Sequence, residues 1–419
     1  RTAAAAAYQE AAALRPSDPL PYLRLARLYL DWNRPQEGLA AVAAAERRGG
    51  SPAQVVSLRA ALCAAQGDWE GAIVHGERAL ALDPTDLAVR RLVARGYVGL
   101  GRLEKAMAHY RALLGMDPAD PLAHEGLGAL LALSNPAAAG PHLEAASTPL
   151  ASELMDVLGR AGDDPAHRLA QVGQTCLAHG EPALAVLALE WALARRPAYA
   201  EAHALLGQAL VQSGRSQEGL EHLEEAVRLA PDSALARSLL GLYHLRTGDP
   251  AAARPHLEAA YDLDPDNPAL SLYLAQVYAG LGQYSVAEVW LEEATRLAPE
   301  DPAVWEGVAR FYLDRSMARQ GLEAALNLLR LAPESGVAQD LQGWAQFLSG
   351  HYPEAEGRLL RAVELDPSLV TAYYHLGQVY VYLGRVEEAR AAFIRALDVN
   401  TDPVLRGEIE RALRRIAGR

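Results

Sequence analysis

The chain has 419 residues, and 39 Lys+Arg against 52 Asp+Glu give it a formal net charge of −13. Because 51% of the residues are hydrophobic, the chain can bury a core, which excludes a wholly disordered protein. The acidic balance argues against sequence-independent nucleic-acid binding, which needs excess Lys and Arg to displace counterions. We also expect no membrane span, since no stretch approaches the roughly 18 apolar residues that one requires.

Prolines recur at steps of 34 residues along most of the chain. The two series are Pro84 and Pro118, then Pro197, Pro231, Pro265, Pro299, Pro333 and Pro367. With this proline taken as position 32 of a repeat, positions 8 and 20 carry Gly or Ala in every repeat. Small residues let two helices approach closely, and a Gly at position 15 of most repeats is a helix-ending residue. Each repeat is therefore predicted to be a pair of short, closely packed helices.

The first predicted helix covers residues 2–14 and ends before Pro16. It has the character of the second helix of a pair, so we expect the chain to begin inside a repeat and the native protein to continue upstream. Eleven helix pairs are then predicted to begin near residues 19, 53, 87, 121, 166, 200, 234, 268, 302, 336 and 370. We expect residues 1–148 to form an N-terminal subarray, residues 166–402 a C-terminal subarray, and residues 403–419 a capping helix.

The regular spacing breaks once, between Pro118 and Pro197. The 79 residues that separate them are two repeats plus 11 residues, or about three helical turns. The excess lies in residues 147–165, where a helix-like segment from Leu150 to Arg160 is followed by Gly-Asp-Asp-Pro. Two interpretations stay open. Either residues 149–165 form an extra helix and a break that bends the array, or they are an insertion without effect on its direction.

This pattern resembles the tetratricopeptide repeat family over nearly the whole chain. Residues 200–233, AEAHALLGQALVQSGRSQEGLEHLEEAVRLAPDS, follow the family pattern almost position by position, as do residues 370–403. The resemblance implies an all-α fold. The expected architecture is a right-handed superhelical solenoid of about eleven antiparallel helix pairs with a C-terminal capping helix.

No motif for catalysis or metal binding stands out in the sequence. A phosphate-binding P-loop needs Gly-Lys, whereas the only lysine, Lys105, follows Glu104. The acidic run at residues 262–267 lacks the Gly and Glu of a calcium-binding loop. Cys63 and Cys176 both fall at position 11, a packing position, so we expect core thiols rather than nucleophiles. We therefore predict no enzyme activity, no cofactor and no metal ion.

Five histidines share position 23 of their repeats: His75, His109, His142, His222 and His256. Equivalent positions in adjacent repeats lie on the order of 10 Å apart, the distance between packed helices. Zinc needs its ligand nitrogens about 2 Å from one centre, so this row is not expected to share a metal ion. No single helix carries a His-x-x-x-His pair either. We interpret these histidines as semi-exposed side chains repeated with the unit.

The resemblance also implies a concave groove lined by positions 2, 5, 9, 12 and 13 of the first helices. In the last three repeats the residues predicted to contact a partner are Arg310, Leu313, Trp344, Phe347, Tyr374, Gln378, Val381 and Tyr382. Fully desolvated aromatic anchors contribute on the order of 2 kcal/mol or more each to binding. The set predicts a groove for an amphipathic helix or apolar peptide segment of another protein. The alternative is that the aromatic residues cover the end of the solenoid and pack against the capping helix.

We therefore predict a non-catalytic protein-binding scaffold or adaptor. The alternative is the helical part of a larger enzyme, or of a membrane-anchored assembly subunit, whose working domain lies upstream of residue 1. The carboxylate clamp of chaperone-binding family members is not predicted. Only Arg91 and Arg95 fall at suitable groove positions, both in one repeat, and the Asn residues of the clamp are missing. The sequence fixes neither the compartment nor the oligomeric state.

Overall fold

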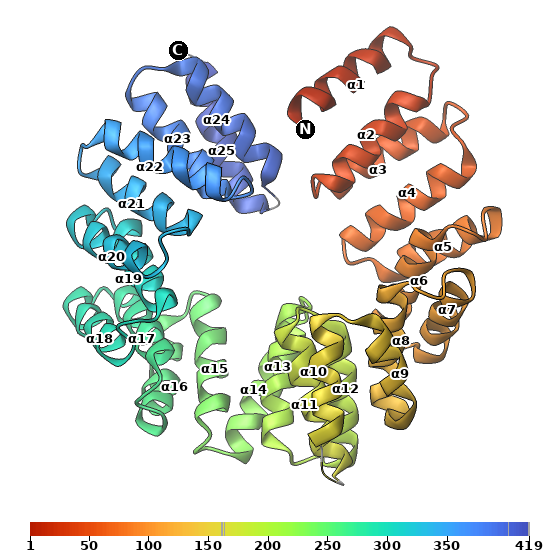
Figure 1. Cartoon of the computed structure of the whole chain (residues 1–419), viewed down its shortest axis with the longest axis horizontal. Helices are drawn as coiled ribbons and strands as arrows, with labels where there is room; N and C mark the ends of the chain where they lie inside the picture. Colours follow the sequence, from red (N-terminus) through yellow and green to blue (C-terminus); the bar gives the residue numbers. More distant parts are fainter. Residues whose placement is uncertain (161, 163, 401, 418–419) are drawn as a thin grey trace. The chain divides into compact units, whose positions relative to one another are not determined.

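The computed structural model describes residues 1–160, 162, 164–400 and 402–417, and within them the regular elements are 25 helices and no strand (Figure 1). The first fourteen are α1 (Thr2–Leu14), α2 (Leu20–Asp31), α3 (Pro35–Glu46), α4 (Pro52–Ala65), α5 (Trp69–Leu82), α6 (Leu87–Gly99), α7 (Leu103–Met116), α8 (Pro121–Ser134), α9 (Pro136–Ala146), α10 (Pro149–Arg160), α11 (Pro165–Ala178), α12 (Pro182–Arg195), α13 (Ala200–Gln212) and α14 (Ser216–Leu229). The others are α15 (Ala234–Arg246), α16 (Pro250–Leu263), α17 (Pro268–Gly280), α18 (Tyr284–Leu297), α19 (Pro302–Asp314), α20 (Ala318–Leu331), α21 (Gly336–Leu348), α22 (Tyr352–Leu365), α23 (Val370–Tyr382), α24 (Val386–Val399) and α25 (Pro403–Ala417).

The predicted all-α fold of paired antiparallel helices is confirmed. The first helices of the eleven repeats are α2, α4, α6, α8, α11, α13, α15, α17, α19, α21 and α23, and each begins within one residue of its predicted start. Within each unit, first helices pack against the helix that follows them, as α13 does against α14 and α21 against α22. The spacing of prolines and small residues was therefore sufficient to place every repeat.

Backbone geometry explains the two kinds of turn. Inside ten of the eleven repeats, the residue at position 15 has a positive φ, which Gly adopts without a steric penalty. Eight repeats use Gly there, with φ between 67 (Gly101) and 83 (Gly350), and Asn33 and Ser316 take the same conformation in two others. Between repeats, a short polar side chain such as Asp301 accepts a hydrogen bond from a backbone N–H of the next helix, which satisfies its free donors.

Glycine at position 8 makes room for a large side chain from the second helix. A Cβ on Gly377 would lie 2.3 Å from the ring of Phe393, and one on Gly207 would lie 2.6 Å from Leu223. Phe393 is fully buried and Leu223 is 1% exposed. The small residues are thus where the two helices of a repeat interlock, as the repeat pattern predicts.

The helices form two compact units. Residues 5–240 make one, called here the N-terminal unit, and residues 241–419 together with residues 1–4 make the other, the C-terminal unit. In the N-terminal unit a continuous apolar core runs from α4 to α13. In the C-terminal unit, a core of buried Ala, Leu and Val side chains extends from α17 to α21.

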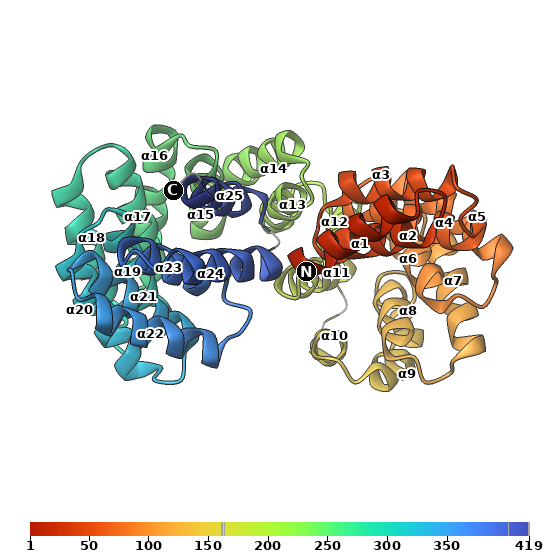
Figure 2. The same ribbon diagram turned by 90° about the horizontal axis from the view of Figure 1, so that it is seen from above.

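The extra residues of the N-terminal unit form α10, which packs against α8, α9 and α11 (Figure 2). Its Leu150 is 5% exposed and its Leu154 is fully buried. The next repeat then makes contacts that a regular array would not make, because α12 packs against α6 and α8. Leu187 of α12 comes within 3.5 Å of a Cβ placed on Gly101, in the turn after α6. The division into subarrays 1–148 and 166–402 stays a prediction.

In the C-terminal unit, α25 packs on α24. Ile409 and Ile416 of α25 are buried, whereas Val404, near the start of this helix, is 73% exposed. Residues 418–419 of the predicted capping helix lie outside the described residues. Within the part of the chain that the structure describes, no helix is both long and apolar enough to cross a bilayer.

Candidate partner-binding surfaces

The first helices of the first three repeats enclose a groove with a cavity volume of about 580 Å³. Its lining comes from α2, α4 and α6, and we call it the N-terminal groove. Leu20, Leu58 and Leu92 form apolar parts of its lining. Leu20 is 51% exposed, and Leu58 and Leu92 are half-buried, so all three offer apolar surface to a partner.

The repeat pattern explains why these side chains converge. Leu20 occupies position 2 of its repeat, Ala61 position 9, and Leu58 and Leu92 position 6. The family resemblance implied positions 2, 5, 9, 12 and 13, and position 6, which lines this groove, was not among them. Apolar residues at position 6 of successive repeats were the signal that could have located this groove from the sequence.

The two sides of the N-terminal groove carry opposite charges. Arg24 and Arg27, both exposed, lie on α2, and Asp83 and Asp86 precede α6. Arg27 also pairs with Asp31, with its Nε 3.6 Å from a carboxylate oxygen. Hydrogen bonds from the hydroxyl and N–H of Thr85 hold the pKa of Asp83 below its ordinary value, so Asp83 is ionised at neutral pH. The groove therefore has a basic wall and an acidic wall around apolar side chains.

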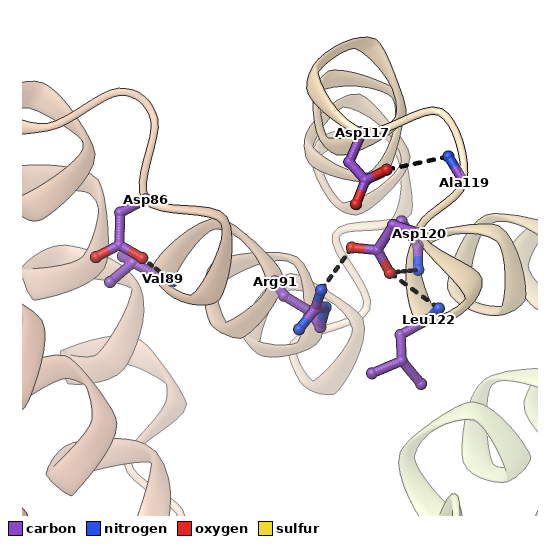
Figure 3. A network of polar contacts seen from close by, with 8 residues as sticks. Asp86, Val89, Arg91, Asp117, Ala119, Asp120 and Leu122 are labelled. Atoms are coloured by element: carbon purple, nitrogen blue, oxygen red, sulfur yellow. Dashed lines mark hydrogen bonds and ion pairs between the residues drawn. The ribbon is translucent and has the colours of Figure 1, made fainter.

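Arg91 and Arg95, the two arginines of α6 at clamp-like positions, are both held by carboxylates of the chain. Arg91 donates to Asp120 at 2.5 Å (Figure 3), and Arg95 lies 3.9 Å from Glu181 of the α11–α12 turn. Asp120 also caps α8 by accepting hydrogen bonds from the N–H groups of Leu122 and Ala123. Burial opposes ionisation of Asp120, but the hydrogen bond from Arg91 and those of the cap outweigh it and lower the pKa.

Three of the residues predicted to bind a partner come together on α21 and α23. Trp344 stacks on Phe347 with ring centroids 4.9 Å apart, and the edge of Tyr382 meets Phe347 at 5.9 Å. Two rings that the sequence analysis missed complete the group. His375 stacks on Trp344 at 4.2 Å, and Tyr352 lies 4.2 Å from Tyr382. We call these five residues the C-terminal aromatic cluster. Most of these rings therefore contact one another, and the contacts join two adjacent repeats.

A buried carboxylate fixes one side of this cluster. Asp340, 1% exposed, accepts hydrogen bonds from the hydroxyl of Thr371 at 2.7 Å and from Nδ1 of His375 at 2.7 Å. Its two oxygens thus connect α21 to α23 and orient the imidazole that stacks on Trp344. His375 lies at position 6 of its repeat, the same position that supplies Leu58 and Leu92 to the N-terminal groove.

The remaining predicted residues are not members of this cluster, although the ring of Tyr374 lies 6.0 Å from that of His375. The prediction for Leu313 was wrong. Leu313 is 3% exposed and packs where a Cβ on Gly321 would be, so it belongs to the core between α19 and α20. Arg310 is half-exposed and bonds to Glu306 on its own helix at 2.9 Å. The remaining three, Tyr374, Gln378 and Val381, are all half-buried; Gln378 donates to the hydroxyl of Tyr374, whose ring packs on Phe393.

Both cysteines lie in the core, as their packing positions predicted. Burial raises the pKa of Cys63 and raises that of Cys176 to about 12, so both thiols are protonated at neutral pH. Among the residues with described positions, no group of three or more His, Cys, Asp or Glu converges to hold a metal ion.

Comparisons with solved structures concern the fold alone, because identities are low. A tetratricopeptide repeat protein from Parabacteroides merdae is 15% identical, with a TM-score of 0.50 over 60% of this chain and 98% of that chain. Yeast Tom70 is 16% identical, with a TM-score of 0.49 over 96% of this chain and 95% of Tom70. The Cut9–Hcn1 hetero-tetramer of APC/C is 15% identical, with a TM-score of 0.45 over 98% of this chain and 92% of that chain.

Comparison with protein families identifies the repeat directly. No curated protein matches the chain. Two sequence models of the tetratricopeptide repeat do match it, one over residues 64–133 and 244–311, the other over residues 23–86, 173–234, 341–403 and 374–417. Together these segments cover more than half of the chain and overlap the helix pairs described above. The chain belongs to the tetratricopeptide repeat family.

Proposed function

We propose that the chain is a non-catalytic scaffold or adaptor that holds a segment of another protein in its N-terminal groove. Tetratricopeptide repeat proteins are generally protein-interaction scaffolds. The observation that carries the proposal is the cavity of about 580 Å³ made by three successive first helices. Concave, mostly apolar surfaces with a few placed polar groups are the usual sites of ligand binding.

The chemistry of the groove favours an amphipathic helix or an apolar peptide segment. The apolar side chains of the bound segment would lie on Leu20, Leu58 and Leu92. These three residues provide apolar surface along the groove without a deep specificity pocket. Acidic residues of the partner would face Arg24 and Arg27, and basic residues would face Asp83 and Asp86. Such complementary charges speed association and set the orientation of the bound segment.

A second contact surface is proposed in the C-terminal unit. It comprises the predicted set without Leu313: Arg310, Trp344, Phe347, Tyr374, Gln378, Val381 and Tyr382. Tyr382 and the neighbouring Leu383 are 61% and 39% exposed, so they present the most accessible apolar area of this surface. Trp344 is half-buried among other rings, and its replacement would disturb packing as well as binding.

The groove proposal can be tested with peptides selected from a random displayed library against the whole chain. We expect the bound peptides to share spaced apolar residues, with acidic residues on one side of the apolar face and basic residues on the other. Leu58→Glu should weaken their binding by about tenfold or more, since a charge would replace apolar contact area at the centre of the groove. Arg24→Glu should weaken binding less and reduce its dependence on salt.

The matched control is Val74→Glu, which places the same charge at a 65% exposed position on the second helix α5. Circular dichroism should show equal helicity for all variants. If Leu58→Glu and Val74→Glu both bind the peptides as well as the wild-type chain does, the N-terminal groove is not the binding site. Loss of binding only on Tyr382→Ser would assign the interaction to the C-terminal surface instead.

A further inference from the structure

Two repeats bring a pair of histidines together by the same geometry. Nδ1 of His203 on α13 lies 2.9 Å from Nδ1 of His222 on α14, and Nδ1 of His124 on α8 lies 3.0 Å from Nδ1 of His142 on α9. The paired residues are 19 and 18 positions apart, which no short sequence motif captures. All four side chains are half-buried, so the facing nitrogens are held in place yet remain near solvent.

Hydrogen bonding fixes the tautomer of the histidine on the first helix of each pair, His203 or His124. Nε2 of His203 lies 2.9 Å from the carbonyl oxygen of Pro197, and Nε2 of His124 lies 3.0 Å from that of Pro118. A carbonyl only accepts hydrogen bonds, so Nε2 carries the proton and the neutral ring keeps a lone pair on Nδ1. A backbone carbonyl bound to the far nitrogen is the arrangement that orients metal-binding histidines in proteins.

We propose that His203 and His222 form a site for a divalent transition-metal ion such as Zn²⁺ or Cu²⁺. Nitrogens about 2.0–2.1 Å from one ion at angles of about 90–110° lie about 2.8–3.4 Å apart, a range that includes the observed separation. The site has two protein ligands, and water completes the coordination because the rings are only half-buried. It is independent of the proposed function, since it lies on α13 and α14 and the N-terminal groove lies on α2, α4 and α6.

Metal binding requires a rearrangement of one proton. In the metal-free pair, Nδ1 of His222 donates to the lone pair of His203. When the ion takes both Nδ1 atoms, that proton leaves Nδ1 and a proton is taken up at Nε2 of the same ring, through solvent. The net protonation of a neutral pair is unchanged, and at a pH where the rings are charged the ion must displace protons.

Neighbouring charges distinguish the two pairs. The carboxylates of Glu218, Glu221 and Glu225 act on His222, against a single guanidinium, that of Arg215. Glu225 acts on both rings of the pair. His142 of the other pair is instead influenced by Arg111. Negative charge near the ligands attracts a cation and positive charge repels it. The His203–His222 pair is therefore the tighter site, and His124–His142 is a weaker second one.

The test is titration of the full chain with Zn²⁺ by calorimetry at pH 7.5, together with electron paramagnetic resonance of bound Cu²⁺. We expect two imidazole nitrogens on Cu²⁺ at the tighter site. His203→Gln and His222→Gln should each remove one of them and weaken Zn²⁺ binding at that site by about tenfold or more. His351→Gln, at the exposed N-cap of α22, is the matched control and should change nothing.

If a variant folds poorly, the Cu²⁺ resonance spectrum of the wild-type chain still tests the proposal. A Cu²⁺ spectrum without two coupled nitrogens in the wild-type chain would overturn the site, as would Zn²⁺ binding that is equal in His203→Gln and wild type. Loss of both sites in His203→Gln, with helicity retained by circular dichroism, would also contradict the two separate pairs.

Discussion

At the scale of single residues, the repeat depends on a few positions where the backbone allows only certain side chains. In ten of the eleven repeats, position 15 adopts a positive φ where the chain reverses between the two helices; the turn at Asn135 instead has φ −147. Gly fills it in eight repeats, and these glycines were recognised from the sequence because they recur at a fixed offset. Asn33 and Ser316 take the same conformation and were not predicted, since only their place in the repeat reveals them.

Ser316→Gly should therefore stabilise the C-terminal unit. Ser316 has φ 58, and a residue with a side chain is destabilised in this conformation by on the order of 1 kcal/mol relative to Gly. We expect the thermal unfolding midpoint to rise. Ser349→Gly is the control, because Ser349 ends α21 with φ −86 and its hydroxyl donates to the Ala345 carbonyl at 2.8 Å. An equal rise in both variants would show that strain at Ser316 is not the cause.

Asp120 should make stability depend on pH. Its pKa is lowered in the folded chain, so its contribution is fully present above the unfolded pKa of about 3.9 and is lost as the pH falls below it. Asp120→Asn should cost about 1–3 kcal/mol in urea unfolding at pH 7, because the charged hydrogen bond from Arg91 is lost. The difference from wild type should shrink below about pH 4.

Asp301→Asn is the control for this pH dependence, because Asp301 caps α19 from an exposed position where water already solvates the carboxylate. Asp301→Asn should lower the free energy of unfolding at pH 7 by less than Asp120→Asn does. A gap between Asp120→Asn and wild type that stays constant from pH 7 to pH 3 would contradict the assignment of the ion pair as the source.

At the scale of helices, the sequence determined local structure well and long-range packing poorly. Helix starts followed from recurring Pro, Gly and Ala, and even the additional helix near Leu150 was predicted from its composition. The contact of α12 with α6 and α8 was not predicted, because it joins surfaces far apart in the chain that carry no common pattern. The histidine pairs were missed for a related reason, since they form between helices and not along one.

Leu154→Ala tests whether α10 holds α12 against α6 and α8. Removing this fully buried side chain should cost about 2–5 kcal/mol through lost burial and a cavity. Hydrogen exchange should increase in α8 to α12 more than in α2 to α4. Met155→Ala, next to it but 40% exposed, should change stability by only about 0.5 kcal/mol. Equal exchange in the two variants would mean that α10 is not a packing element.

At the scale of the whole molecule, the repeat architecture follows from the sequence but the binding surface does not. The aromatic residues predicted as partner contacts in the last three repeats largely contact each other, and Leu313 belongs to the core. A helical pattern reports which positions face the groove, whereas exposure depends on what neighbouring repeats place beside them. The N-terminal groove was not predicted from the sequence, because leucines and charged residues form much of its lining and aromatic anchors are not among the lining residues that the structure describes.

The most direct measurement is site-specific photo-crosslinking of the whole chain in native extract. A photoreactive phenylalanine derivative would replace Leu58 in the N-terminal groove, Tyr382 on the C-terminal surface, or Val74 on the outer side of α5, and mass spectrometry would map the joined peptides. The account predicts one recurrent partner segment, apolar and flanked by charges, joined at position 58 and absent at position 74. Crosslinks at position 58 no different from those at position 74 would contradict the groove as the binding site.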